Sequence, residues 1–153
     1  MSRQTLTTFE HRSWGANRVY DLAPWPMGYY TRLLTGMLVW DERDDELVYC
    51  RATPRAWLDP GQRLHVERLQ TRFGPTSLTL TAQHDRIEGD VDLPARFPPR
   101  SVCLRLRAHG KITAVWLNDE PTPCDPATGT VVLPATAQRI HIRASIDRCC
   151  TPP

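Results

Sequence analysis

The sequence predicts a mainly β protein, an antiparallel β-sandwich of about eight strands with one N-terminal α-helix packed on it. The 153 residues include 14 prolines, about 9% against an average near 5%. So many helix breakers favour short strands joined by rigid turns. Beyond residue 45, apolar side chains recur at every second position, which is typical of strands with one buried and one wet face.

Residues 1–45 are expected to form an aromatic-rich N-terminal segment that contains the helix. Seven of the chain's twelve Phe, Tyr and Trp residues precede Asp41. Between Met27 and Trp40 apolar residues return every three or four positions, the period of a helix with one apolar face. Pro26 suits the first turn of such a helix. We therefore predict a helix over residues 27–40.

Residues 46–148 are expected to form the sandwich, and residues 149–153 a short tail. The predicted strands are Glu46–Arg51, Arg63–Leu69, Ser77–Gln83, Arg86–Leu93, Ser101–Ala108, Lys111–Asn118, Thr130–Leu133 and Arg139–Ile146. Turn-forming residues separate them, among them an Asp-Pro-Ala-Thr-Gly stretch at 125–129. Two connections are short enough for hairpins, namely Gln83–Arg86 and Ala108–Lys111.

The charge balance argues against nucleic acid as a partner. Nineteen basic and 17 acidic residues give a net charge of +2, which is too small for a surface dedicated to phosphates. Eighteen of the 19 basic residues are arginine, and they are spread along the whole chain. We interpret the preference for arginine over lysine as a compositional bias of the source genome.

No targeting or membrane segment is visible in the sequence. The N-terminus has no apolar run of the kind a signal peptide needs, and no stretch approaches the length of a membrane span. The sequence as written therefore predicts a cytoplasmic protein without a membrane partner. A longer parent protein would leave the location open.

Neither cysteines nor histidines follow a metal-binding pattern. Five cysteines, at 50, 103, 124, 149 and 150, contain no C-x-x-C, and their odd number argues against a closed disulfide framework. The five histidines are scattered without ligand spacing. The sequence therefore predicts no metal and no cofactor.

The N-terminal segment holds the best candidates for a carbohydrate site. Sugars offer C–H faces to aromatic rings and hydroxyls to polar side chains. The candidate binding residues are Trp14, Asn17, Arg18, Tyr20, Asp21 and Trp25. Glu10 and Asp21 would be the carboxylates of a small glycoside hydrolase, since that reaction needs a pair. The other interpretation of these aromatics is packing against the sandwich or a partner.

Two further tryptophans are interpreted as packing residues. Trp116 alternates with apolar neighbours, so both faces of its strand are apolar and the outer one needs a cover. The helix that ends at Trp40 is the candidate for that cover. We therefore expect Trp116 and Trp40 to pack rather than to bind ligand.

Parts of the chain resemble the C-terminal end of bacterial six-hairpin glycosidase-like proteins. The resemblance lies in residues 37–80 and 101–134. The motifs that carry it are Ala52–Leu58, Thr71–Pro75, Trp116–Pro121 and Asp125–Gly129. It implies a small antiparallel sandwich that follows a barrel of helical hairpins, with residues 9–40 as the tail of that barrel. The family's catalytic carboxylates lie in the barrel, so the resemblance implies no catalytic residue in this chain.

The function expected from the sequence is that of a non-catalytic, structural β-sandwich module related to carbohydrate-active proteins. It would interact through its aromatic N-terminal segment with a helical partner domain or with a second copy. One alternative is a free-standing carbohydrate-binding module. The other is a small glycoside hydrolase.

Overall fold

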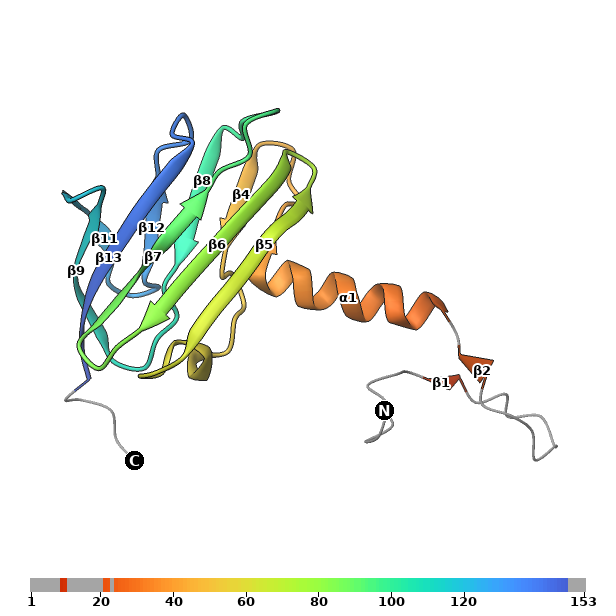
Figure 1. Ribbon diagram of the computed structural model, residues 1–153, viewed down its shortest axis with the longest axis horizontal. Coiled ribbons are helices and arrows are strands. Elements are labelled where there is room, and N and C mark those ends of the chain that lie inside the picture. Colours follow the sequence, from red (N-terminus) through yellow and green to blue (C-terminus); the bar gives the residue numbers. More distant parts are fainter. Residues whose placement is uncertain (1–8, 11–20, 23, 149–153) are drawn as a thin grey trace. The chain divides into compact units, whose positions relative to one another are not determined.

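The computed structural model describes residues 9–10, 21–22 and 24–148, with side chains from Gly28 onward (Figure 1). The chain divides into two compact units, Met1–Gly36 and Met37–Pro153. In the first unit β1 (Phe9–Glu10) pairs antiparallel with β2 (Asp21–Leu22). Helix α1 (Pro24–Leu38) begins in the first unit and ends in the second.

The predicted helix spans residues 27–40. Helix α1 begins three residues earlier, at Pro24, and ends two residues earlier, at Leu38. Its last carbonyls explain the earlier end. The Cys50 N–H donates to the Leu38 carbonyl at 2.6 Å and the Ala52 N–H to the Met37 carbonyl at 3.2 Å. The backbone then turns into β3 (Val39–Trp40), so Trp40 belongs to a strand and its prediction as a helical residue is wrong.

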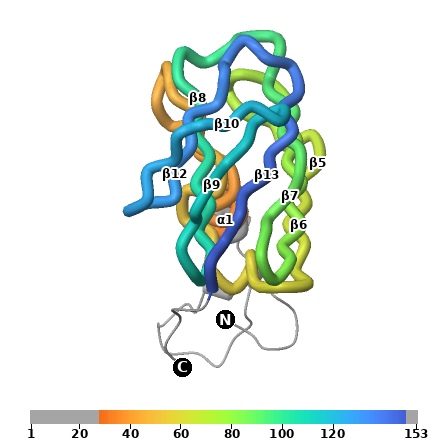
Figure 2. Tube along the Cα trace, turned by 90° about the vertical axis from the view of Figure 1, so that its left-hand side faces the viewer, coloured from red at the N-terminus to blue at the C-terminus, as the bar shows by residue number. Residues whose placement is uncertain are grey.

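The second unit is a two-layer β-sandwich, which confirms the predicted fold class (Figures 1 and 2). One sheet has six strands, in the order β10 (Glu120–Thr122), β9 (Lys111–Leu117), β13 (Arg139–Asp147), β7 (Arg86–Asp92), β6 (Gly74–Ala82) and β5 (Arg63–Thr71). The other has five, in the order β11 (Cys124–Asp125), β12 (Thr130–Leu133), β8 (Ser101–Arg105), β4 (Glu46–Tyr49) and β3. Every pair is antiparallel except β4–β8, which is parallel.

All eight predicted strands are present, with ends that shift by a few residues. The predicted hairpin at Gln83–Arg86 is confirmed, because β6 and β7 pair and the Gln83 N–H donates to the Arg86 carbonyl at 2.7 Å. The predicted hairpin at Ala108–Lys111 is wrong. The strands on either side of it, β8 and β9, lie in different sheets.

The Ala108–Lys111 connection packs closely against β13 where it crosses between the layers. A Cβ on Gly110 would lie 2.5 Å from the Asp147 carbonyl oxygen at the end of β13, and the φ of Gly110 is +109°. Only glycine fits so close to that backbone in that conformation. The connection leads the chain to the end of β13, beside which β9 begins.

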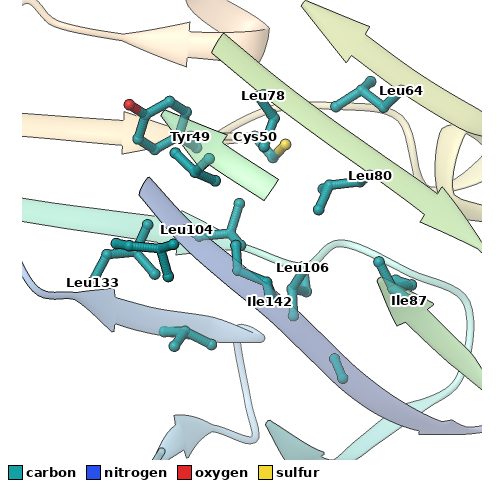
Figure 3. Packing of buried hydrophobic residues seen from close by; sticks show 14 of the residues in the cluster. Tyr49, Cys50, Leu64, Leu78, Leu80, Ile87, Leu104, Leu106, Leu133 and Ile142 are labelled. Atoms are coloured by element: carbon teal, nitrogen blue, oxygen red, sulfur yellow. The ribbon is translucent and has the colours of Figure 1, made fainter. Parts of the chain in front are cut away.

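The core between the sheets is built from the inward members of each alternating strand. Figure 3 shows Tyr49 and Leu104 of the five-stranded sheet beside Leu78 and Ile142 of the six-stranded sheet. One polar contact crosses this core. The fully buried Tyr49 hydroxyl lies 2.5 Å from the Thr76 hydroxyl, which itself donates to the Asp92 carbonyl at 2.6 Å.

Arg148 closes one end of the sandwich. Its guanidinium donates to the carbonyls of Leu58 at 2.9 Å, His84 at 2.9 Å and His109 at 3.0 Å. Its side chain is 10% exposed and lies 3.8 Å from the Asp59 carboxylate. One side chain near the end of the chain thus joins a 3₁₀ turn, the β6–β7 turn and the connection between the layers.

Candidate functional site

The carbohydrate-binding residues predicted from the sequence lie outside the part of the chain whose side chains are described. Trp14, Asn17, Arg18 and Tyr20 have no described placement, while Asp21 lies in β2 by its backbone. Trp25 likewise lies in α1 by its backbone alone. Their role in binding sugars stays a prediction.

The two candidate carboxylates of a glycoside hydrolase are described in backbone only. The β1–β2 register places Glu10 opposite Asp21. The role of this pair in catalysis also stays a prediction.

The two tryptophans interpreted as packing residues lie on different sheets and outside the core. Trp116 lies on β9, with the Arg143 guanidinium 5.0 Å from its ring centroid. Trp40 lies on β3, with the Arg51 guanidinium at 3.9 Å and that of Arg43 at 5.7 Å. Both rings are half-buried and both pack against arginine rather than against apolar side chains of the core.

The outer face of the five-stranded sheet combines an apolar row with a polar one. The register aligns Trp40 with Val48, Val48 with Cys103, and Cys103 with Val132. Val48 is only 7% exposed although it is not part of the hydrophobic cluster between the sheets, so its neighbours on the outer face cover it. Val132, at the other end of the row, is 63% exposed.

The polar row runs beside the apolar one and carries a relay of hydrogen bonds. Arg105 is aligned with Thr130 and Thr130 with Asp125. The Arg105 Nε donates to the Thr130 hydroxyl at 3.3 Å, and that hydroxyl lies 2.7 Å from the Thr128 hydroxyl. Thr128 in turn donates to the Asp125 carboxylate at 2.5 Å. The relay connects the Arg105 cation on β8 to the Asp125 anion on β11 by way of β12.

Two hollows share Arg105. The first, of about 240 Å³, is lined by Arg55, Arg105 and Arg107, by the turn at Pro126–Gly129, and by the connection between the layers together with Ile112 of β9. The second, of about 250 Å³, is lined by Trp40, Val48 and Cys103 together with four charged side chains: Arg43, Glu46, Arg51 and Arg105. We refer to the five arginines of the two hollows, Arg43, Arg51, Arg55, Arg105 and Arg107, as the arginine face.

Most of the arginine face has no carboxylate partner. Arg43 pairs with Glu46 at 3.1 Å. Within the described part of the chain, no carboxylate oxygen lies within 4 Å of the other four guanidiniums. Arg105 and Arg107 are half-buried, so water screens their charge less than it would at a fully exposed site.

The turn beside the first hollow is closed by hydrogen bonds that favour the charged form of a carboxylate. The Gly129 N–H donates to the Asp125 carbonyl at 2.8 Å, as expected for the predicted turn. The hydrogen bonds from the Thr128 hydroxyl and the Ala127 N–H lower the pKa of Asp125, and the charge of Arg105 adds to them. A ligand in the first hollow therefore meets one fixed carboxylate at its border.

The outer face of the six-stranded sheet is instead charge-balanced. Asp90 lies 3.2 Å from the guanidinium of Arg139 and 3.2 Å from the His141 ring. Partial burial raises the pKa of Asp90, but the hydrogen bonds from Arg139 and His141 outweigh it and the pKa is lowered. This face neutralises its own charges, and the arginine face does not.

Neither a metal cluster nor a membrane helix is found in the described residues. No group of three or more His, Cys, Asp or Glu side chains there could hold a metal ion. No helix in that part of the chain is long and apolar enough to cross a membrane. No family model, no curated protein and no solved structure matches this chain.

Proposed function

We propose that this chain is a non-catalytic accessory module, in which the β-sandwich is a stable base and the N-terminal segment makes the contact with another protein surface. The resemblance of residues 37–80 and 101–134 to the C-terminal sandwich of six-hairpin glycosidase-like proteins supports this role. In those proteins the sandwich accompanies a helical barrel. The module would therefore dock on helices.

The observation that carries the proposal is the exposure of apolar side chains on α1. Tyr29 is 70% exposed and Leu33 is 62% exposed. These two residues are four positions apart, so they lie on one face of the helix. None of the residues from Gly28 to Leu38 is buried. Large apolar side chains gathered on one exposed face typically mark an interaction surface.

In the absence of a helical partner, this face is expected to pair with a second copy of the chain. Two apolar helix faces that meet across a symmetry axis bury the same residues twice. Size-exclusion chromatography with light scattering, at loading concentrations from about 5 to 500 μM, measures that association. We expect the average mass to rise with concentration.

Two matched variants locate the contact. Leu33→Glu places a charge on the apolar face of α1 and should leave the protein monomeric. Val132→Glu makes the same kind of change at a residue that is 63% exposed on the five-stranded sheet, and should leave the association unchanged. A wild-type protein that stays monomeric throughout the series would contradict the proposal, as would an association abolished by Val132→Glu alone.

A further inference from the structure

We propose that the arginine face is a second binding site, independent of α1, and that it takes an acidic peptide in extended conformation. The site lies wholly within the second compact unit, and it extends from β3 across β4 and β8 to the turn at Pro126–Gly129 and the connection between the layers. Its ligand would carry a few carboxylates spaced along a chain, with apolar side chains between them.

The charge of the site favours an anionic ligand. Four guanidiniums without a carboxylate within 4 Å among the described residues converge on two adjoining hollows, and each guanidinium offers a fork of donors suited to a carboxylate. Arg105 is the centre of the arrangement, because it lines both hollows. Its Nε is engaged with Thr130, whereas no described residue accepts a hydrogen bond from its two Nη atoms.

The two hollows adjoin at Arg105, which favours an elongated ligand. Arg43 and Arg51 line one hollow, Arg55 and Arg107 line the other, and Arg105 lies between them. A single small anion would engage one hollow and leave the other unused. A chain with carboxylates a few residues apart would engage both.

The acids at the borders argue against a dense polyanion. Glu46 lines the second hollow, and Asp125 belongs to the turn that borders the first. Nucleic acid carries about one charge per 1.7 Å of duplex, so it would bring phosphates close to these two carboxylates. A peptide can place its few acidic groups on the arginines and neutral residues elsewhere.

The apolar row argues for a peptide over an acidic sugar. Trp40, Val48, Cys103 and Val132 form a continuous row beside Arg105, and Val132 is 63% exposed. The Arg51 guanidinium lies 3.9 Å from the Trp40 ring centroid. It therefore covers a ring face that a sugar would use for stacking. Valine or leucine side chains of a peptide would instead lie along the row.

The test is fluorescence anisotropy with a fluorescein-labelled peptide of alternating glutamate and valine or leucine, seven residues long. The full chain is titrated into this peptide and into the same peptide with glutamine for every glutamate. We expect saturable binding of the acidic peptide alone. We also expect the affinity to fall with added salt, because exposed charges are screened.

A matched pair of double variants assigns the site. Arg105→Gln with Arg107→Gln removes two charges from the arginine face and should weaken binding roughly tenfold, which is about 1.4 kcal/mol. Arg63→Gln with Arg100→Gln removes the same charge from exposed arginines outside both hollows and should change the affinity less than twofold. Far-UV circular dichroism of each variant checks that the sandwich is folded.

Several outcomes would overturn the proposal. These are an absence of binding, equal binding of the glutamine peptide, or equal losses in the two double variants. Tighter binding of a heparin oligosaccharide or of single-stranded DNA, lost in the same arginine variants, would assign the face to another polyanion. Leu33→Glu should bind the peptide like wild type, so failure of the proposed helix contact and failure of this site are separable.

Discussion

Replacement of Arg148 by methionine is expected to destabilise the sandwich more than replacement of an exposed arginine. The side chain is 10% exposed and donates to the carbonyls of Leu58, His84 and His109 at 2.9 to 3.0 Å. Loss of the donor leaves the part-buried carbonyls of Leu58 and His109 short of a partner, at about 1 kcal/mol or more each, whereas water can replace it at the exposed His84 carbonyl. We therefore expect a loss of roughly 2 to 4 kcal/mol in the free energy of unfolding.

The assay is urea denaturation followed by far-UV circular dichroism. Arg148→Lys keeps the charge but replaces the planar fork by a single ammonium, and should recover only part of the loss. Arg139→Met is the control, because Arg139 is 67% exposed and its ion pairs with Asp90 and Asp92 are at the surface. We expect it to cost less than about 1 kcal/mol. Equal losses in Arg148→Met and Arg139→Met would refute the role of Arg148 in closing the sandwich.

Three further predictions concern the interior and one turn. Tyr49→Phe removes the hydroxyl bridge between the sheets and should cost about 1 kcal/mol in urea denaturation; an unchanged midpoint would contradict the bridge. Burial raises the pKa of the Cys50 thiol from 9.0 to about 12, so the unfolded chain loses this proton first. Stability that is full below pH 9 should therefore fall as the pH rises toward 12, by about 2 kcal/mol at pH 10.5. Urea denaturation at pH 8 and at pH 10.5 measures this loss, and Cys50→Ala should lose about 2 kcal/mol less than wild type between the two pH values. An equal fall in the free energy of unfolding in both proteins would count against the prediction. Gly129→Ala places a Cβ 2.6 Å from the Leu106 carbonyl oxygen at a φ of +67°, whereas Gly61→Ala at +84° meets nothing within 4 Å. Thermal unfolding should show Gly129→Ala as the more damaging of the two, since both share the backbone strain and only one has the overlap.

Most of the strands could be predicted from the sequence because their alternation is local. Val102 and Leu104 face the core while Cys103 and Arg105 face outward, as the period of two requires. The crossing at Ala108–Lys111 could not be predicted, since a hairpin-length connection has the same sequence signal whether it joins neighbours or changes layers. The close approach of Gly110 to β13 is a tertiary contact between residues far apart in the sequence, so no local pattern signals it.

The arginine face could not be predicted because its members are far apart in the sequence. Arg43 and Arg51 flank β4, while Arg105 ends β8. They meet because β4 and β8 pair in parallel, which places Val48 beside Cys103. In a chain where 18 of 19 basic residues are arginine, no single one stands out. The outward alternation of Cys103, Arg105 and Arg107 was the one local signal.

The central claim is that the module makes its protein contact through α1. Hydrogen–deuterium exchange, measured on dilute and on concentrated protein, tests it most directly because exchange localises the surface that becomes protected. We predict that the backbone amides of residues 28–38 become protected in the concentrated sample while those of β5 to β13 exchange as before. Unchanged exchange over residues 28–38, with new protection on either sheet of the sandwich, would contradict the account.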